Sequence, residues 1–224
     1  MRSTGLVGRW PLDSDTVVGT TARDVGRNKN NGTITAGTGG LTTGIHGEAE
    51  GAYNFDGSAT KVVCGDVLNS GLGDFTISAC VKISSGTWGT IATKGQNNIG
   101  HTYGLFYESS RKFLCYISNN VGTVLTTAND GTTIGSGSWH HVVATFDRDG
   151  NLTRYVDATV SGALLDISSY SAEDMSNVKE FCIGAWNTAI SYGGYLTGDI
   201  CKVRVYSYAL SAGQIANLYQ SYGL

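Results

Sequence analysis

Residues 137–158, GSWHHVVATFDRDGNLTRYVDA, carry the clearest indication of the fold. It contains two short apolar runs, residues 142–146 and 152–156, on either side of the turn-forming segment 147–151. Runs of this kind are typical of a β-hairpin, and Gly150 can adopt the left-handed backbone that a short hairpin loop favours. Because one hairpin cannot bury its own apolar face, further strands have to cover it.

The composition agrees with an all-β protein. Charged residues make up 15% of the chain, against about 25% in typical proteins, whereas glycine contributes 32 residues and proline one. The chain has 224 residues, of which 41% are hydrophobic. A compact chain of this length buries roughly 70% of its unfolded surface. A core is therefore expected without support from metals or disulfides.

Charge and hydropathy exclude two classes of partner. The net charge of −3 offers no field for a polyanion, so nucleic-acid binding is not expected. No run approaches the roughly 20 apolar residues that a membrane span needs. Residues 1–13, MRSTGLVGRWPLD, contain no apolar core of a secretion signal, and with Met1 in place we expect a natural start. The five cysteines form no CxxC pair, so they are expected to be free and buried. Free thiols in turn predict that the protein is made in the cytosol.

Further strands and one helix are expected along the chain. Residues 74–83, DFTISACVKI, alternate apolar and other side chains and leave Cys80 on the face opposite the core. Ser211 and Gln214 form a capping box, and the helix after it has an apolar stripe of Ile215, Leu218, Tyr219 and Tyr222. Without any linker, residues 1–224 are expected to form one domain of about a dozen strands. The other strands are expected at residues 6–10, 52–55, 88–93, 103–107, 112–117, 159–165, 178–185 and 194–206.

Several short motifs occur in the order in which one known family has them. They are LVGRWPLD at 6–13, the Asn/Gly-rich segment 24–33, YNFDG at 53–57, FTISA at 75–79, WHHV at 139–142, YVD at 155–157, GDI at 198–200, VRVY at 203–206 and ALS at 209–211. On these motifs the chain resembles the LamG-like (laminin G-like) branch of the concanavalin A-like lectin/glucanase domains. The resemblance implies an antiparallel jelly-roll β-sandwich, here with a short C-terminal helix.

The chain departs from the family's pattern in three respects. Cys80 stands where the family commonly has tryptophan, and Cys201-Lys202 where it tends to have an acidic pair. Ala158 replaces a glycine after YVD. Alanine disfavours a left-handed backbone, so an altered turn is expected there.

Several residue types in the sequence could belong to a metal or catalytic site. His140 and His141 are adjacent, so on a strand they point to opposite faces and cannot share one metal. The family sometimes carries calcium near the Asn/Gly loop. Aspartate and asparagine residues also build turns, but here they could supply the hard oxygen ligands that calcium prefers. The candidate ligands are Asp13, Asp24, Asn28 and Asn31. No cofactor is required. No aligned set of carboxylates of the glucanase kind occurs, so the chain is not expected to be an enzyme.

Aromatic side chains are the remaining candidates for ligand binding. Sugar rings stack on tryptophan and tyrosine, and polar loops supply hydrogen bonds. Four aromatic residues lie in or beside glycine-rich stretches, and the sequence is compatible with either exposure or core packing for each of them: Trp88, Trp186, Tyr192 and Tyr195.

Two classes of function follow. The first is a non-catalytic structural protein of the virion surface, a phage capsid decoration or fibre component that is made in the cytosol. Its partners would be other virion proteins or further copies of itself, as a homo-oligomer, together with adhesion to glycans. The second is a secreted carbohydrate-binding, lectin-like module of a cellular organism, which would act outside the cell.

Overall fold

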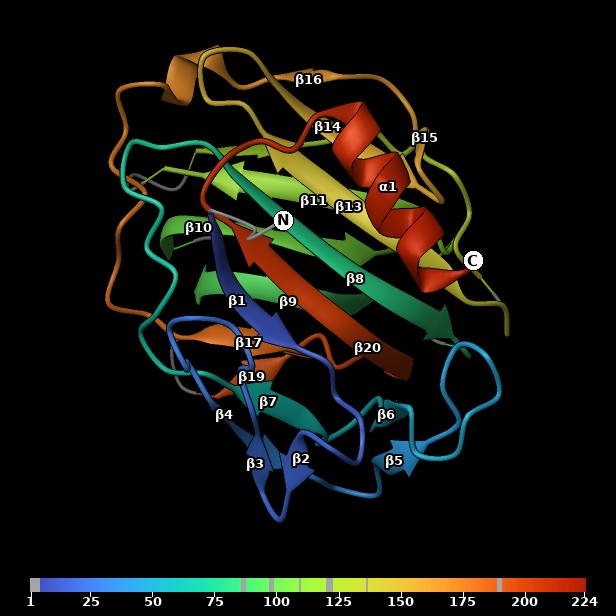
Figure 1. Ribbon diagram of the computed structural model, residues 1–224. Coiled ribbons are helices and arrows are strands. Elements are labelled where there is room, and N and C mark those ends of the chain that lie inside the picture. The colour runs from blue at the N-terminus through green and yellow to red at the C-terminus, as the bar shows by residue number, and fades with distance from the viewer. Residues whose placement is uncertain are drawn as a thin grey trace.

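Two antiparallel sheets lie face to face in the computed structural model, which describes residues 5–85, 88–96, 99–108, 110–119, 123–135, 137–188 and 191–224 (Figure 1). Within these residues, sheet A has nine strands. Their spatial order is β15 (Thr159–Val160), β14 (Asn151–Val156), β13 (His140–Phe146), β8 (Phe75–Ile83), β20 (Thr197–Tyr206), β6 (Ala52–Asp56) and β5 (Gly40–Thr42), with β1 (Leu6–Trp10) beside β20 and β16 (Leu165–Asp166) beside β14.

Sheet B has eleven strands in the same described residues. Their order is β12 (Val124–Thr126), β11 (Phe113–Ser118), β10 (Ile99–Tyr107), β9 (Gly89–Gln96), β17 (Phe181–Ile183), β7 (Lys61–Val63), β4 (Gly32–Thr35), β3 (Thr21–Ala22) and β2 (Val17–Val18), with β18 (Trp186–Asn187) and β19 (Tyr192–Gly193) off this path. A single turn of 3-10 helix spans Ser168–Tyr170, and the helix α1 spans Ala212–Tyr222.

The expected antiparallel sandwich with a C-terminal helix is confirmed. The predicted strand at the N-terminus agrees with β1, and the strand expected at residues 74–83 is β8 with one residue less. The expected number of strands was too small. The described residues form twenty, because several strands are only two or three residues long and show no alternation in the sequence.

An aromatic stack joins the inner faces of the two sheets. Phe75 of β8 pairs in register with Phe146 of β13, and the two ring centroids lie 4.2 Å apart. Tyr103 of β10, in the opposite sheet, lies 4.4 Å from the Phe75 ring. All three side chains are buried. Burial of each such side chain stabilises the fold by roughly 2 kcal/mol, so this stack is a strong link between the sheets.

Helix α1 covers the outer face of sheet A, the face turned away from sheet B (Figure 1). Ser211 accepts the Gln214 N–H and the Gln214 side chain accepts the Ser211 N–H, so the predicted capping box is present. Ile215, Leu218 and Tyr222 are buried against the sheet. In the part of the chain that the structure describes, no helix has the length and apolar character needed to cross a bilayer.

The cysteines confirm the expected packing. All five are free and buried. Cys80 faces away from the core between the sheets, as predicted, and lies in register with Cys201 of β20 under α1. The outward face of β8 is thus covered by protein and not by solvent.

The two adjacent histidines point to opposite faces of β13, as predicted. His140 Nδ1 lies 2.8 Å from a carboxylate oxygen of Asp157. His141 is completely buried under α1, with its ring 6.2 Å from that of Tyr219 and 5.2 Å from that of Tyr222. Neither ring nitrogen of His141 has a hydrogen-bond partner among the described residues. Burial lowers the pKa of His141 to about 4.

The turn between β13 and β14 differs from the prediction. None of residues 147–151 has a positive φ, so Gly150 does not adopt the left-handed backbone. The turn is closed by the Gly150 N–H, which donates to the Asp147 carbonyl at 3.1 Å. Arg148 is buried beneath the turn, where its guanidinium donates to the carbonyls of Tyr170 and Glu173. A loop of this length can be built on a type I turn, which needs no left-handed residue.

The turn after β14 also differs from the prediction. Val156 pairs with Thr159, and between them Asp157 and Ala158 have φ values of 50° and 62°. Two left-handed central residues define a type I′ turn, which matches the right-handed twist of paired strands. The expectation that Ala158 alters the turn was wrong. The Asp157 carboxylate accepts the His141 N–H at 2.9 Å and thereby holds the turn against the strain at Ala158.

Replacing Ala158 with glycine is expected to stabilise the protein. A left-handed backbone at alanine destabilises the folded state by about 1–2 kcal/mol. Glycine avoids this strain, but its greater freedom in the unfolded chain lowers stability by about 0.5–1 kcal/mol relative to alanine. The free energy of unfolding should rise by about 0.5–1 kcal/mol and Tm by roughly 2 °C, measured by thermal denaturation. The matched control is Ala216→Gly inside α1, which should lower the free energy of unfolding by about 1 kcal/mol. An unchanged or lower Tm for Ala158→Gly would contradict the strain.

Stability should fall between pH 6.5 and 4 because of His141. Its pKa in the folded state is about 4, below the unfolded value of 6.5, so the unfolded chain binds more protons in this window. The contribution is complete above pH 6.5 and lost as the pH falls through 4. It amounts to about 3 kcal/mol at most. His141→Phe should flatten this part of the profile in urea denaturation, and an unchanged profile would contradict the assignment to His141.

Candidate functional site

The hairpin β18–β19 brings aromatic residues to the outer face of sheet B. Trp186 pairs with Gly193, and Asn187 pairs with Tyr192. A Cβ atom on Gly193 would lie 2.7 Å from Nε1 of Trp186, so the indole lies directly against this glycine. Gly194 has a φ of +53°, and a Cβ atom there would lie 2.2 Å from the Trp88 ring. The two glycines therefore make room for the two tryptophans.

Four rings form a continuous group, called here the aromatic cluster: Trp88, Phe106, Tyr116 and Trp186. Ring centroids of Trp88 and Trp186 lie 4.1 Å apart, and those of Trp88 and Phe106 lie 5.1 Å apart. Phe106 stacks on Tyr116 at 4.5 Å. Phe106 and Tyr116 are buried, whereas both tryptophans are half-buried. The cluster thus has a fixed base and two partly exposed rings.

The base lies on the outer face of sheet B because of the strand alternation in β10. Tyr103, Leu105 and Tyr107 belong to the core between the sheets. Phe106 therefore points the other way, and its ring lies over Gly104, where a Cβ atom would come within 2.8 Å of it.

The same hairpin also carries a polar group, which consists of Lys61, Glu180, Asn187, Tyr192 and Tyr195. The Glu180 carboxylate accepts the Tyr192 hydroxyl at 2.8 Å and the Asn187 side-chain amide at 2.6 Å. The Lys61 ammonium lies 4.6 Å from the ring centre of Tyr192 and 5.7 Å from that of Tyr195. Burial, and secondarily the Glu180 carboxylate, raises the pKa of Tyr192, so its hydroxyl stays a hydrogen-bond donor at neutral pH.

The structure places all four predicted aromatic residues at this hairpin. Trp88 and Trp186 touch each other, while Tyr192 and Tyr195 share Lys61. All four are half-buried, which is intermediate between the exposure and the core packing left open by the sequence. That they bind a ligand stays a prediction.

Sequence reasoning missed the base of the cluster and the polar group. Leu105-Phe106-Tyr107 and Cys115-Tyr116-Ile117 are runs of consecutive apolar residues inside strands. Since neighbouring side chains in a strand point to opposite faces, such runs indicate an apolar residue on the outer face. No local signal marks Glu180, because its contacts with Tyr192 and Asn187 arise only through the hairpin.

The predicted calcium ligands are already engaged in the fold. Asp24 is buried, and its carboxylate accepts backbone N–H groups from Arg9, Gly26 and Asn30 at 2.7–2.8 Å. The side-chain oxygen of Asn31 accepts the Asp24 N–H at 3.0 Å. These bonds are turn-forming.

The other two predicted ligands have different surroundings. The Asn28 amide donates to the Val7 carbonyl at 3.1 Å. Asp13 lines a pocket together with Arg9, Lys202 and Arg204, whose positive charges oppose a cation there. In the described residues, no group of three or more His, Cys, Asp or Glu side chains is arranged to hold a metal. Calcium at Asp13, Asp24, Asn28 and Asn31 stays a prediction.

Several solved structures share this fold. Domain 4 of an extracellular GH43 arabinanase from Geobacillus stearothermophilus, solved with arabinotriose, superposes with a TM-score of 0.70 at 20% identity, over 96% of this chain and 98% of that one. The binding domain of Paraclostridial Mosquitocidal Protein 1 gives a TM-score of 0.74 at 14% identity, over 97% of this chain and 52% of that one. The botulinum neurotoxin DC binding domain, solved with SialylT, gives 0.66 at 13%, over 97% and 51%.

These similarities differ in extent. The chain spans nearly the whole arabinanase domain but about half the length of the two toxin binding domains. All three structures are binding domains or a domain solved with a bound sugar, and at these identities they show a common fold. No curated protein sequence matches the chain.

The sequence profile of one family matches residues 56–216. This range begins at the end of β6 and reaches into α1, and so contains the aromatic cluster and the strands that carry it. The chain belongs to the concanavalin A-like lectin/glucanases superfamily.

Proposed function

We propose that this chain is a non-catalytic carbohydrate-binding sandwich whose ligand lies on the aromatic cluster. The observation that carries the proposal is the pair of half-buried tryptophans, Trp88 and Trp186, held 4.1 Å apart over a buried aromatic base. Rigid aromatic faces provide apolar contact for the faces of sugar rings at a low entropic cost. The arabinanase domain that was solved with arabinotriose, and the toxin domain solved with SialylT, share the fold and support a sugar as the ligand.

The polar group beside the cluster supplies what a sugar needs in addition to stacking. Lys61 is a donor, and Glu180 is an acceptor already oriented by Tyr192 and Asn187. Such groups hydrogen-bond to sugar hydroxyls and set the orientation of the ligand. Neutral oligosaccharides are favoured because one cation and one carboxylate balance each other here.

The non-catalytic part of the proposal rests on how Glu180 is used. Glycoside hydrolysis generally needs two carboxyl groups on either side of the scissile bond, one of them acting as an acid. The Glu180 carboxylate accepts two hydrogen bonds, from Tyr192 and Asn187. The polar group contains this one carboxylate, whereas hydrolysis needs a pair, and the two bonds suit it to orienting a ligand.

The virion surface is the proposed place of action. Five free, buried thiols suit a protein made in a reducing cytosol, and a phage capsid decoration or fibre component is made there before it acts outside the cell. One such component can adhere to glycans, associate with further copies of itself and contact other virion proteins. A secreted carbohydrate-binding module is the alternative, and co-sedimentation of the protein with purified particles would separate the two.

Replacing Trp186 with alanine should weaken glycan binding by about tenfold or more, which corresponds to ~1.4 kcal/mol. The reason is the loss of one of the two exposed stacking faces. Arabinotriose and a glycan array are the probes, with calorimetry for the sugars that bind. The matched control is Trp139→Ala, since Trp139 is also half-buried but packs on the outer face of sheet A. Equal losses in the two variants, or no sugar bound by the parent protein, would contradict the proposal.

Chelation should leave this binding unchanged, because the aromatic cluster and the polar group need no metal to stack on or hydrogen-bond a sugar. The measurement is the same calorimetry with calcium and with EDTA. A loss of affinity in EDTA would instead support a calcium site.

A further inference from the structure

Two arginines oppose each other on the outer face of sheet A. Arg9 of β1 pairs in register with Arg204 of β20. Like charges directly across a strand pair destabilise a sheet. Among the described residues, neither guanidinium group has a carboxylate within 4.0 Å, and the same holds for the Lys202 ammonium. Three cations are thus held together without an ion pair.

The backbone of β20 is distorted at Lys202, next to the two opposed arginines. The register with β8 shifts between Cys201 and Arg204, and Lys202 has a left-handed φ of 54°. A left-handed lysine costs about 1–2 kcal/mol. The Lys202 N–H donates to the Pro11 carbonyl at 3.0 Å, which ties this distortion to the end of β1. Two unfavourable features, strain and repulsion, therefore meet at one place.

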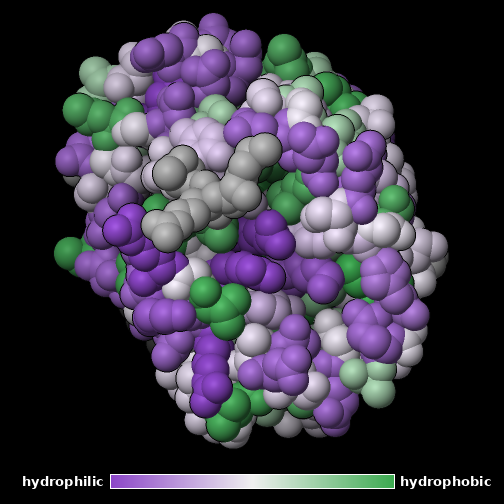
Figure 2. Space-filling model, viewed as in Figure 1, coloured by the Kyte–Doolittle hydropathy of each residue, from purple (hydrophilic) through white to green (hydrophobic). Residues whose placement is uncertain are grey.

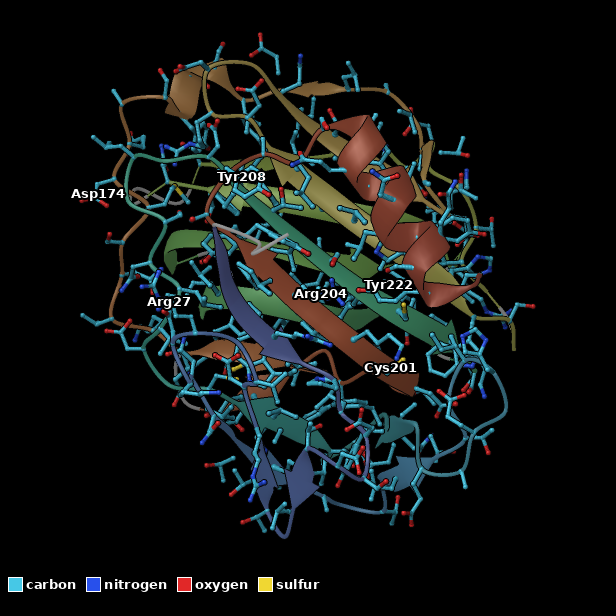
Figure 3. All side chains as sticks on the ribbon, viewed as in Figure 1. Arg27, Asp174, Cys201, Arg204, Tyr208 and Tyr222 are labelled. Atoms are coloured by element: carbon cyan, nitrogen blue, oxygen red, sulfur yellow. The ribbon has the colours of Figure 1, made fainter. Side chains whose placement is uncertain are left out.

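A pocket lies at this place, between β1, β20 and the C-terminal end of α1. Arg9, Lys202, Arg204 and Tyr222 line it. Figure 3 shows Arg204 and Tyr222 close together beside β20, and Figure 2 shows strongly hydrophilic surface in the middle of this face. The Lys202 ammonium lies 5.9 Å and the Arg204 guanidinium 5.2 Å from the centre of the Tyr222 ring.

Two features of the lining suit a negatively charged ligand. Tyr222 is 5% exposed, and its hydroxyl has no hydrogen-bond partner among the described residues. Asp13 is the acidic residue of the lining, but its Oδ1 accepts the Thr16 hydroxyl at 2.7 Å. Three positive side chains against one carboxylate leave the lining with a surplus of two positive charges.

We propose that this pocket binds a tetrahedral oxyanion, either sulfate or phosphate. A doubly charged anion would match the surplus of two charges, turn the repulsion between Arg9 and Arg204 into attraction, and accept a bond from the Tyr222 hydroxyl. Guanidinium groups bind such oxyanions in a bidentate manner, and charge-assisted bonds of this kind are stronger than neutral ones. The pocket is on the outer face of sheet A, whereas the aromatic cluster is on the outer face of sheet B.

The test measures binding of sodium sulfate and sodium phosphate by calorimetry, together with Tm over millimolar concentrations at constant ionic strength. The protein should give saturable heats and a saturable rise in Tm of a few degrees. Arg9→Gln and Lys202→Gln should each weaken binding about tenfold or more. Tyr222→Phe keeps the ring, and should weaken binding several-fold. Arg27→Gln is the matched control, because Arg27 is exposed and lies away from the pocket (Figure 3).

One readout separates a binding pocket from ordinary surface charge. Without added anion, Arg9→Gln should raise Tm or leave it unchanged, because the repulsion with Arg204 is gone, while the response to sulfate is lost. Absence of a saturable response in the parent protein would overturn the proposal. So would an equal loss in Arg9→Gln and Arg27→Gln. If Arg9→Gln does not fold, as judged by circular dichroism, Lys202→Gln carries the comparison.

The source of the oxyanion is tested with a sulfated monosaccharide beside inorganic sulfate. Binding of the sugar sulfate at least about tenfold tighter would identify the group as part of a glycan, and equal binding would identify a free ion. Trp186→Ala should leave sulfate binding unchanged, and Arg9→Gln should leave arabinotriose binding unchanged. Failure at one site is therefore distinguishable from failure at the other.

Discussion

β8 is buried on both of its faces, and this burial organises sheet A around it. On its inner face, Phe75 stacks on Phe146 and meets Tyr103 of the opposite sheet. On its outer face, Cys80 lies under α1 with Val143 and Cys201. A strand buried on both faces has to pair on both edges, since an unpaired backbone N–H or C=O group is costly away from water. β13 and β20 meet this need, and the other strands of sheet A extend from them.

The same constraint gives the two outer faces different properties. On sheet A, α1 takes up much of the outer face, and the cationic pocket lies at its C-terminal end. On sheet B, the outer face carries the half-buried tryptophans, which pack on Phe106. Two consecutive glycines of the β18–β19 hairpin leave space for the two indole rings. The scaffold therefore separates a stacking surface from a charged one, and the two can bind chemically different ligands independently of each other.

Buried cations hold the loops that connect these layers. Arg148 reaches from one turn to carbonyls near the 3-10 helix, and Arg154 of β14 donates to the carbonyls of Phe113 and Ala128 and to Asp130. Lys94 of β9 contacts Asp66 at 2.7 Å. A buried cation needs such partners to offset its desolvation. Their use in joining long loops explains why Lys94, Arg148 and Arg154 are completely or almost completely buried in a chain with few charged residues.

Features that depend on neighbours along the chain can be predicted from the sequence. Alternation predicted β8 and the opposite directions of His140 and His141, and the capping box predicted α1, because strand pleat and helix periodicity are local properties. Tertiary structure decided the rest. Ala158 adopts a left-handed backbone because strand twist and the hydrogen bond of Asp157 select a type I′ turn. Gly150 does not adopt one, because the contacts of Arg148 and the length of the loop favour a different turn. The aromatic cluster and the opposed arginines come from residues far apart in sequence, and only sheet register brings them together.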